Sequence, residues 1–140
     1  MSSRPTGYAR PLPRITEDNA PFWAAARRHE LRLQKCDACG RLWWPPGPVC
    51  PECLDDRITW TPVSGRGTVS IFVVFHKAWF PEFTSDLPYA VVQVELEEGP
   101  RLTANLVDVR PGEIRVGLPV TVVFDDVTPE VTIPRFRRAP

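Results

Sequence analysis

Apolar and polar residues alternate over most of the chain after residue 56, which is the pattern of half-buried β-strands. Turn-forming residues separate the alternating segments, for example SGRG at 64–67 and EEGP at 97–100. The pattern therefore predicts strands at 57–63, 68–75, 89–96, 102–107 and 118–124, with a final edge segment at 131–136.

One helix is predicted, near the N-terminus. Its segment has a proline in the first turn and three alanines, and we expect it to run to about Arg28. Leu31 and Leu33 then alternate with Arg32 and Gln34, which predicts a strand at 30–35 with the leucines on one face and the polar residues on the other.

Two C-x-x-C motifs, CDAC at 36–39 and CPEC at 50–53, contain all four cysteines. This spacing lets the two thiolates of one tight turn point at a common ion, and two facing turns complete a tetrahedral site of four sulfurs. We predict structural zinc, because four thiolates leave the ion no open position for a substrate. A single iron of the rubredoxin sort is a minor alternative, and a redox dithiol is a third. The predicted ligands are Cys36, Cys39, Cys50 and Cys53.

These patterns predict a mainly β fold with an N-terminal helix and a zinc ribbon. About five strands without helices between most of them then fit a small Greek-key barrel of the oligonucleotide/oligosaccharide-binding (OB) kind. The predicted parts are an extended N-terminal arm at 1–20, the helix and zinc ribbon at 21–62, the OB barrel at 63–127 and a C-terminal tail at 128–140.

Aromatic residues gather in two places. In the ribbon, either one of Trp43 and Trp44 covers the metal site while the other packs on the helix or barrel, or one is exposed as a docking surface. The segment 75–90 is far longer than a hairpin turn, so it either folds over the barrel as a lid or presents its rings to a ligand or protein. Its candidate contacts for a ligand or partner are His76, Lys77, Trp79, Phe80, Phe83 and Tyr89.

Charge and composition narrow the function classes. Among the 140 residues, 17 Lys and Arg balance 17 Asp and Glu, so no global field marks a nucleic-acid or membrane-surface binder. No apolar run reaches the roughly 20 residues of a membrane-spanning helix, and the start lacks the apolar core of a signal peptide, so we expect a cytoplasmic protein. Arg135 and Arg137 add local positive charge that suits anion contact.

Catalytic groups are sparse. No nucleophile or paired carboxylate accompanies His76 in a recognisable arrangement, and the chain has no phosphate-binding loop. The sequence therefore offers no complete catalytic constellation of its own.

Taken together, these segments resemble a known family: acyl-CoA-associated OB-fold proteins with an N-terminal rubredoxin-like zinc ribbon, first described as a domain of unknown function. The resemblance covers nearly the whole chain. It rests on the helix PFWAAARRHEL, the ribbon LQKCDACGRLWWPPGPVCPEC, the junction TWTPVSGRGTVSIFVVFH, the loop FPEFTSDLPYAVVQVEL, the hairpin EEGPRLTANLV and the ending GLPVTVVFDDVTPEVTIPRFRR.

The resemblance implies a non-catalytic subunit that supports a thiolase-like acyl-CoA-processing enzyme, such as a thiolase, an acyltransferase or a retro-aldol lyase of steroid side-chain degradation. It implies a hetero-oligomer, with a hot-dog-fold enoyl-CoA hydratase as a further partner and acyl-CoA as a ligand. We expect removal of the last dozen residues to weaken this complex more than the fold.

The alternative hypothesis is that the chain is a single-stranded nucleic-acid-binding module, because zinc ribbons and OB barrels both serve that role. The neutral balance and the pI of about 6.7 disfavour it, since single-strand grooves are usually basic.

Overall fold

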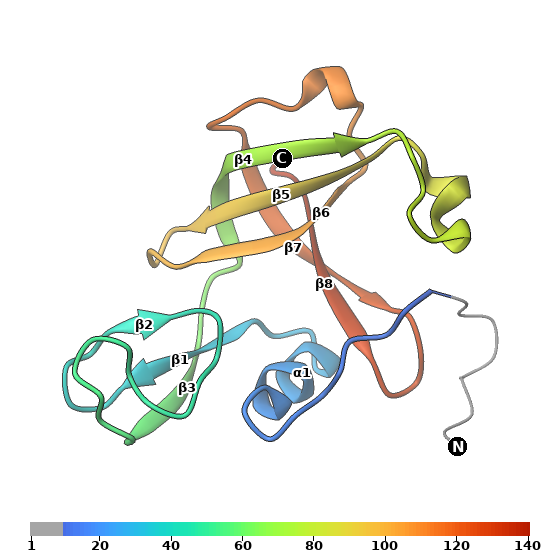
Figure 1. Ribbon diagram of the computed structural model, residues 1–140. Coiled ribbons are helices and arrows are strands. Elements are labelled where there is room, and N and C mark those ends of the chain that lie inside the picture. Colours follow the sequence, from blue (N-terminus) through green and yellow to red (C-terminus); the bar gives the residue numbers. More distant parts are fainter. Residues whose placement is uncertain (1–9) are drawn as a thin grey trace.

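The computed structural model describes residues 10–140, and it divides into a small ribbon, one helix and a barrel (Figure 1). Residues 1–9 of the arm expected at 1–20 lie outside the described part. The elements are α1 (Ala20–Arg27), β1 (Arg32–Cys36), β2 (Leu42–Trp43), β3 (Ile58–Pro62), β4 (Arg66–Phe75), η1 (Pro81–Asp86), β5 (Tyr89–Leu96), β6 (Arg101–Val107), η2 (Pro111–Glu113), β7 (Pro119–Asp126) and β8 (Thr132–Arg138).

The strands form two sheets, as the alternating pattern predicts. The ribbon is a three-stranded antiparallel sheet in the order β2-β1-β3, and the barrel closes in the order β4-β5-β6-β8-β7. In the barrel, β6 and β8 run parallel and the other neighbours run antiparallel. The predicted mainly β fold, with a ribbon followed by an OB barrel, is confirmed. No helix in residues 10–140 combines the length and the apolar character of a membrane span.

The structure contradicts the C-terminal tail expected at 128–140. Residues 132–138 form β8, which lies between β6 and β7 and closes the barrel. Phe136 on this strand is completely buried. Removal of the last dozen residues would take away one wall of the barrel, so the structure also contradicts the expectation that they serve a complex more than the fold.

One apolar core joins the helix and ribbon to the barrel. Phe22 on α1 and Leu33 on β1 belong to the same buried cluster as Val92, Val120 and Phe136 of the barrel. Figure 1 shows α1 below the barrel, next to β8. Burial of each such side chain stabilises the fold by about 1.5–3 kcal/mol relative to exposure, so the two parts stabilise each other.

His29, two residues after the end of α1, connects the helix to β7 of the barrel. His29 adopts a left-handed backbone conformation (φ 60°), which stops the helix. Its Nε2 lies 2.9 Å from Oδ1 of Asp126 at the end of β7, and its ring stacks on Phe124 at 5.2 Å. The helix is thus fixed against β7 by a polar contact and an aromatic one.

Gln34 departs from the predicted alternation on the first strand. The alternation predicts a polar, solvent-facing position for it, but only 4% of it is exposed, while Leu33 before it is buried and Lys35 after it is exposed. Its side-chain amide donates to the carbonyl of Gly47 at 2.9 Å and accepts from the N–H of Gly47 at 2.9 Å. Burial is possible because these two bonds replace the lost contacts with water.

Candidate metal centre and loop-side pocket

The four predicted ligands converge at one end of the ribbon. All four sulfur atoms lie within 4.8 Å of one another. The Sγ atoms of Cys36 and Cys53 are 3.5 Å apart, and those of Cys39 and Cys50 are 3.7 Å apart. In a tetrahedral site with metal–sulfur bonds of about 2.3 Å, neighbouring sulfurs are separated by about 3.8 Å. The donor set and its spacing therefore fit a metal ion held by four thiolates.

The two cysteine turns have the same backbone design. In the first, the N–H of Gly40 donates to the carbonyl of Cys36 at 2.8 Å; in the second, the N–H of Leu54 donates to the carbonyl of Cys50 at 2.9 Å. Both Gly40 (φ 80°) and Leu54 (φ 64°) are left-handed. A glycine adopts this conformation easily, whereas a leucine does so only where the surroundings impose it. The linear pattern did not predict that Leu54 would take the left-handed position that closes the second cysteine turn.

Backbone N–H groups point at the sulfurs and favour their ionised form. The N–H of Cys39 donates to Sγ of Cys36 at 3.4 Å, and the N–H of Glu52 donates to Sγ of Cys50 at 3.4 Å. Burial opposes the ionisation of Cys50, yet hydrogen bonds from the backbone of Cys53 and Glu52 lower its pKa to about 7.

The thiol of Cys53 resists ionisation next to it. A backbone hydrogen bond from Asp55 lowers the pKa of Cys53, but the neighbouring Cys36 sulfur and burial outweigh it and raise that pKa to about 12. Four adjacent thiolates need a cation between them, which is the property of a metal-binding ribbon.

The two ribbon tryptophans have separate structural roles. Trp43 is 5% exposed and packs with Cys36 and Cys50, so it covers the metal site. Trp44 lies against Phe22 of α1, with ring centroids 4.4 Å apart. The covering and packing interpretation fits both residues, and Trp43 has little surface left for a partner.

The aromatic loop folds on itself and is only partly a lid. Phe75 stacks on Tyr89 at 5.1 Å, and Phe83 packs on Tyr89 at 5.7 Å. Trp79 and Phe80 instead remain 67% and 52% exposed. Lys77 lies over the Trp79 ring at 4.5 Å. One half of the loop is therefore anchored, and the other half presents its rings to solvent.

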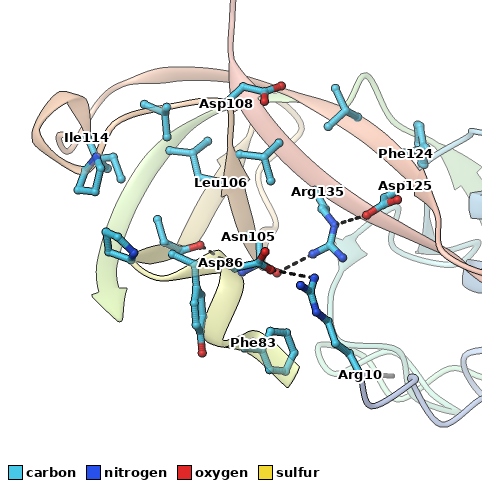
Figure 2. A pocket seen from close by; sticks show the side chains of 17 residues that line it. Arg10, Phe83, Asp86, Asn105, Leu106, Asp108, Ile114, Phe124, Asp125 and Arg135 are labelled. Carbon is cyan, nitrogen blue, oxygen red and sulfur yellow. Dashed lines mark hydrogen bonds and ion pairs between the residues drawn. The ribbon is translucent and has the colours of Figure 1, made fainter. Parts of the chain in front are cut away.

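A pocket of about 560 Å³ lies between η1, the end of β6 and β8 (Figure 2). We call it the loop-side pocket. Its apolar wall includes Leu106, Val109, Ile114 and Phe124, which are shared with or packed on the barrel core. Its polar side chains are Arg10, Asp86, Tyr89, Asn105, Asp108, Asp125 and Arg135.

Arg135 is fixed in place within the polar wall. Only 14% of its side chain is exposed. Its Nε donates to Oδ2 of Asp125 at 2.9 Å, and its Nη1 donates to Oδ1 of Asn105 at 2.8 Å. Asn105 in turn donates to the carbonyl of Ala90 at 3.2 Å. The remaining guanidinium donors of Arg135 are thereby held in one orientation beside an apolar wall.

Arg10 connects the N-terminal segment to the aromatic loop in the same pocket. Its Nη1 pairs with Oδ2 of Asp86 at 2.8 Å, and its guanidinium lies 5.1 Å from the centre of the Phe83 ring. Figure 2 shows Arg10 and Arg135 approaching the pocket from different elements. Sequence reasoning missed Arg10, Asn105 and Asp125, because nothing in the linear pattern indicates that these distant segments meet.

The remaining candidates do not join one site. His76 and Arg137 are exposed and outside the pocket lining. In the helix and ribbon, the basic residues Arg28 and Arg32 share Glu30, and Arg41 pairs with Glu52 at 2.6 Å. Local acidic partners thus offset the positive charge of these arginines.

Comparisons with known proteins agree with the two-part architecture. Residues 23–59 match the family described as the ChsH2 rubredoxin-like zinc ribbon domain, and residues 60–125 match the ChsH2 C-terminal OB-fold domain. A solved structure titled Ltp2-ChsH2(DUF35) aldolase contains a similar chain. The TM-score is 0.85 with 40% identity, over 92% of this chain and 100% of that one.

Two curated relatives are longer proteins. A probable enoyl-CoA hydratase alpha subunit of Thermomonospora curvata is 42% identical over 93% of this chain and 40% of its own length. The 3-oxo-4,17-pregnadiene-20-carboxyl-CoA hydratase alpha subunit of Mycobacterium tuberculosis is 38% identical over 81% of this chain and 36% of its own length. The chain thus spans about two fifths of the length of these relatives or less.

Proposed function

The chain belongs to the ChsH2 family of zinc-ribbon and OB-fold (DUF35) proteins, and we propose that it is the scaffold subunit of an acyl-CoA-processing enzyme. One observation carries the proposal: the chain is similar to the full length of a chain from the Ltp2-ChsH2(DUF35) aldolase. Its partner would be an enzyme of the Ltp2 type, which we expect to be thiolase-like and to hold the catalytic residues.

Zinc is the proposed resident ion, bound by Cys36, Cys39, Cys50 and Cys53. Four thiolates complete its coordination, so the ion would stabilise the ribbon and would not activate a substrate or water. The short ribbon has few buried apolar residues of its own, namely Trp43 and the two buried cysteines, with Ile58 at their edge. Metal binding would supply the stability that this small cluster lacks.

The proposed substrate class of the complex is acyl-CoA thioesters, including those with a steroid-like acyl group. The M. tuberculosis relative is a hydratase subunit named for such a thioester, 3-oxo-4,17-pregnadiene-20-carboxyl-CoA. Within this chain, the loop-side pocket combines an apolar wall with the guanidinium groups of Arg10 and Arg135. The carboxylates of Asp86, Asp108 and Asp125 offset the charge of the two arginines, so the pocket suits an apolar group with hydrogen-bonding ends. A hydratase subunit is a second proposed partner, supported by the names of both relatives.

Co-expression with the Ltp2-type enzyme of the same organism tests the proposal. We expect the two proteins to co-elute after nuclease treatment, and the retro-aldol cleavage of a steroid side-chain CoA thioester to depend on both. Separate elution, with an enzyme equally active alone, would contradict the proposal.

No observation favours the nucleic-acid alternative. The two guanidinium groups of the loop-side pocket are paired with Asp86 and Asp125, so this wall lacks the excess positive charge that a single-strand groove uses. If the co-expression experiment recovers only nuclease-sensitive material, the nucleic-acid-binding hypothesis would be favoured over the scaffold subunit.

A further inference from the structure

The second half of β4 has one neighbouring strand where the first half has two. Residues 71–75 pair with β5 on one side. On the other side, β7 pairs only with residues 66–68 of β4. Within residues 10–140, no strand pairs with the open side of 71–75. A strand edge of this kind leaves backbone N–H and C=O groups without strand partners and is a template for a further strand.

The side chains beside this edge are apolar and exposed. Ile71 and Val73 pair in register with Gln93 and Val91 of β5, on the face opposite the buried Val92. They remain 56% and 51% exposed. Water-exposed β-branched residues on an open strand suit contact with another extended segment.

The edge also lacks the features that normally prevent strand addition. The segment 69–75, VSIFVVF, contains no charged residue and no proline. Natural edge strands usually carry a lysine, a proline or an inward-pointing charge that blocks pairing with another chain. The exposed Trp79 and Phe80 lie in the loop that leaves this strand (Figure 1). Lys77 covers the Trp79 ring in that loop at 4.5 Å, so the uncharged stretch is confined to the strand edge itself.

We propose that residues 71–75 of β4 accept an extended segment of the partner enzyme as an added strand. This inference rests on the proposed function. The edge is uncharged, so the complementary segment would be uncharged and would alternate apolar residues toward Ile71 and Val73. A partner enzyme is favoured over a second copy of this chain because the similar solved chain comes from the Ltp2-ChsH2(DUF35) aldolase, whose name joins two different proteins.

Hydrogen–deuterium exchange tests the backbone part of the inference. Exchange is measured for the isolated protein and for its purified complex with the Ltp2-type enzyme. In the peptide that spans 71–75, we expect the amides that point away from β5 to exchange quickly in the isolated protein and to become protected in the complex, whereas those bonded to β5 exchange slowly in both. A complex in which this peptide exchanges as in the isolated protein would overturn the inference and leave the proposed function standing, whereas failure to form the complex would overturn both.

A matched pair of variants tests the side-chain part. Val73→Lys places an ammonium beside the edge, while Ile15→Lys places one on the segment before α1, where Ile15 is 47% exposed and belongs neither to the metal site nor to the strand edge. Because both side chains face solvent, both variants should fold. We expect Val73→Lys to weaken partner binding by about tenfold or more and Ile15→Lys to leave it unchanged.

Equal binding by wild type and Val73→Lys would contradict the inference. Protection of 71–75 that appears in the isolated protein and rises with its concentration would also contradict it, since that result assigns the edge to a second copy.

Discussion

Gly67 on β4 lies against the backbone carbonyl of Glu95 on β5, so closely that a Cβ at this position would overlap the carbonyl oxygen and the Val94 side chain. The close approach occurs where β4 pairs with both β5 and β7. A side chain there would force apart the strands that close the barrel.

Gly67→Ala should therefore destabilise the protein by about 1–3 kcal/mol or more, the usual cost of overpacking. The measurement is the urea midpoint and slope of unfolding. Gly112→Ala is the matched control, because a Cβ at Gly112 meets no atom within 4 Å. Equal midpoints for the two variants would show that β4 and β5 can separate without cost.

Gln34→Leu should destabilise the ribbon although it replaces a polar residue by an apolar one of similar size. The N–H and C=O of Gly47 would both lose their partner, and each unsatisfied buried group costs about 1–3 kcal/mol. Thermal unfolding of the metal-loaded protein reports the change. Gln93→Leu serves as the control, since Gln93 is only partly buried and has no such pair of backbone bonds. A Gln34→Leu variant as stable as Gln93→Leu would indicate that water replaces the amide.

Cys50→Ser should abolish binding of one zinc ion per chain and unfold the ribbon, because three thiolates and a hydroxyl form a much weaker site. Metal analysis of the purified protein, together with its absorption spectrum, distinguishes colourless zinc from coloured iron. Arg41→Gln removes the neighbouring ion pair with Glu52 but no ligand, so it should retain the metal. Full metal content in Cys50→Ser would contradict a four-cysteine site.

Stability should fall at acidic pH partly through Asp126. The Thr132 hydroxyl, followed by His29, lowers the pKa of this carboxyl in the folded protein. The unfolded chain has the higher pKa, about 3.9. The carboxylate's contribution is thus fully present above that value and is lost as pH falls through the folded pKa.

Urea titrations between neutral and acidic pH measure this effect. The free energy of unfolding should depend less on pH in Asp126→Asn than in wild type. Asp56→Asn, whose carboxylate has no hydrogen bond or ion pair within residues 10–140, should follow the wild-type curve. If the free energy of unfolding falls equally with pH in wild type and in Asp126→Asn, then Asp126 does not contribute to the loss of stability in acid.

Phe136→Ala should cost about 3–5 kcal/mol of stability, as expected for loss of a fully buried aromatic ring. The comparison is Phe80→Ala, whose ring is 52% exposed and whose loss should change stability by no more than about 0.5 kcal/mol. Circular dichroism during thermal unfolding measures both. A small effect for Phe136→Ala would mean that β8 is not needed to close the barrel.

Local patterns predicted the elements well because each element has a strong local signal. Alternation marks Tyr89–Leu96 as a strand, and paired cysteines mark the ribbon. The sequence did not predict the burial of Gln34, because alternation alone cannot show that the loop containing Gly47 folds back over that face. It predicted the strand that contains Phe136 as an edge segment but assigned it to a tail outside the barrel, since only the parallel pairing of β6 with β8 shows that this segment closes the barrel.

The sequence could not predict the loop-side pocket either, because local patterns do not show which distant segments meet. Arg10, Asn105 and Arg135 come from three distant segments, and their meeting depends on barrel closure. For the aromatic loop, the sequence predicted either a lid over the barrel or rings presented to a ligand or protein. Which rings do which depends on tertiary packing, because Phe83 is anchored against Tyr89 whereas Trp79 is exposed.

The shared core has a consequence for how such proteins are inherited. The boundary between the two matched family domains, after residue 59, falls inside strand β3 (Ile58–Pro62), and Phe22 and Leu33 complete the apolar cluster of the barrel. A recombination event at that boundary would split a strand and strip the barrel of part of its covering. We therefore expect the ribbon and the barrel to be inherited together as one evolutionary unit, including in longer fusion proteins.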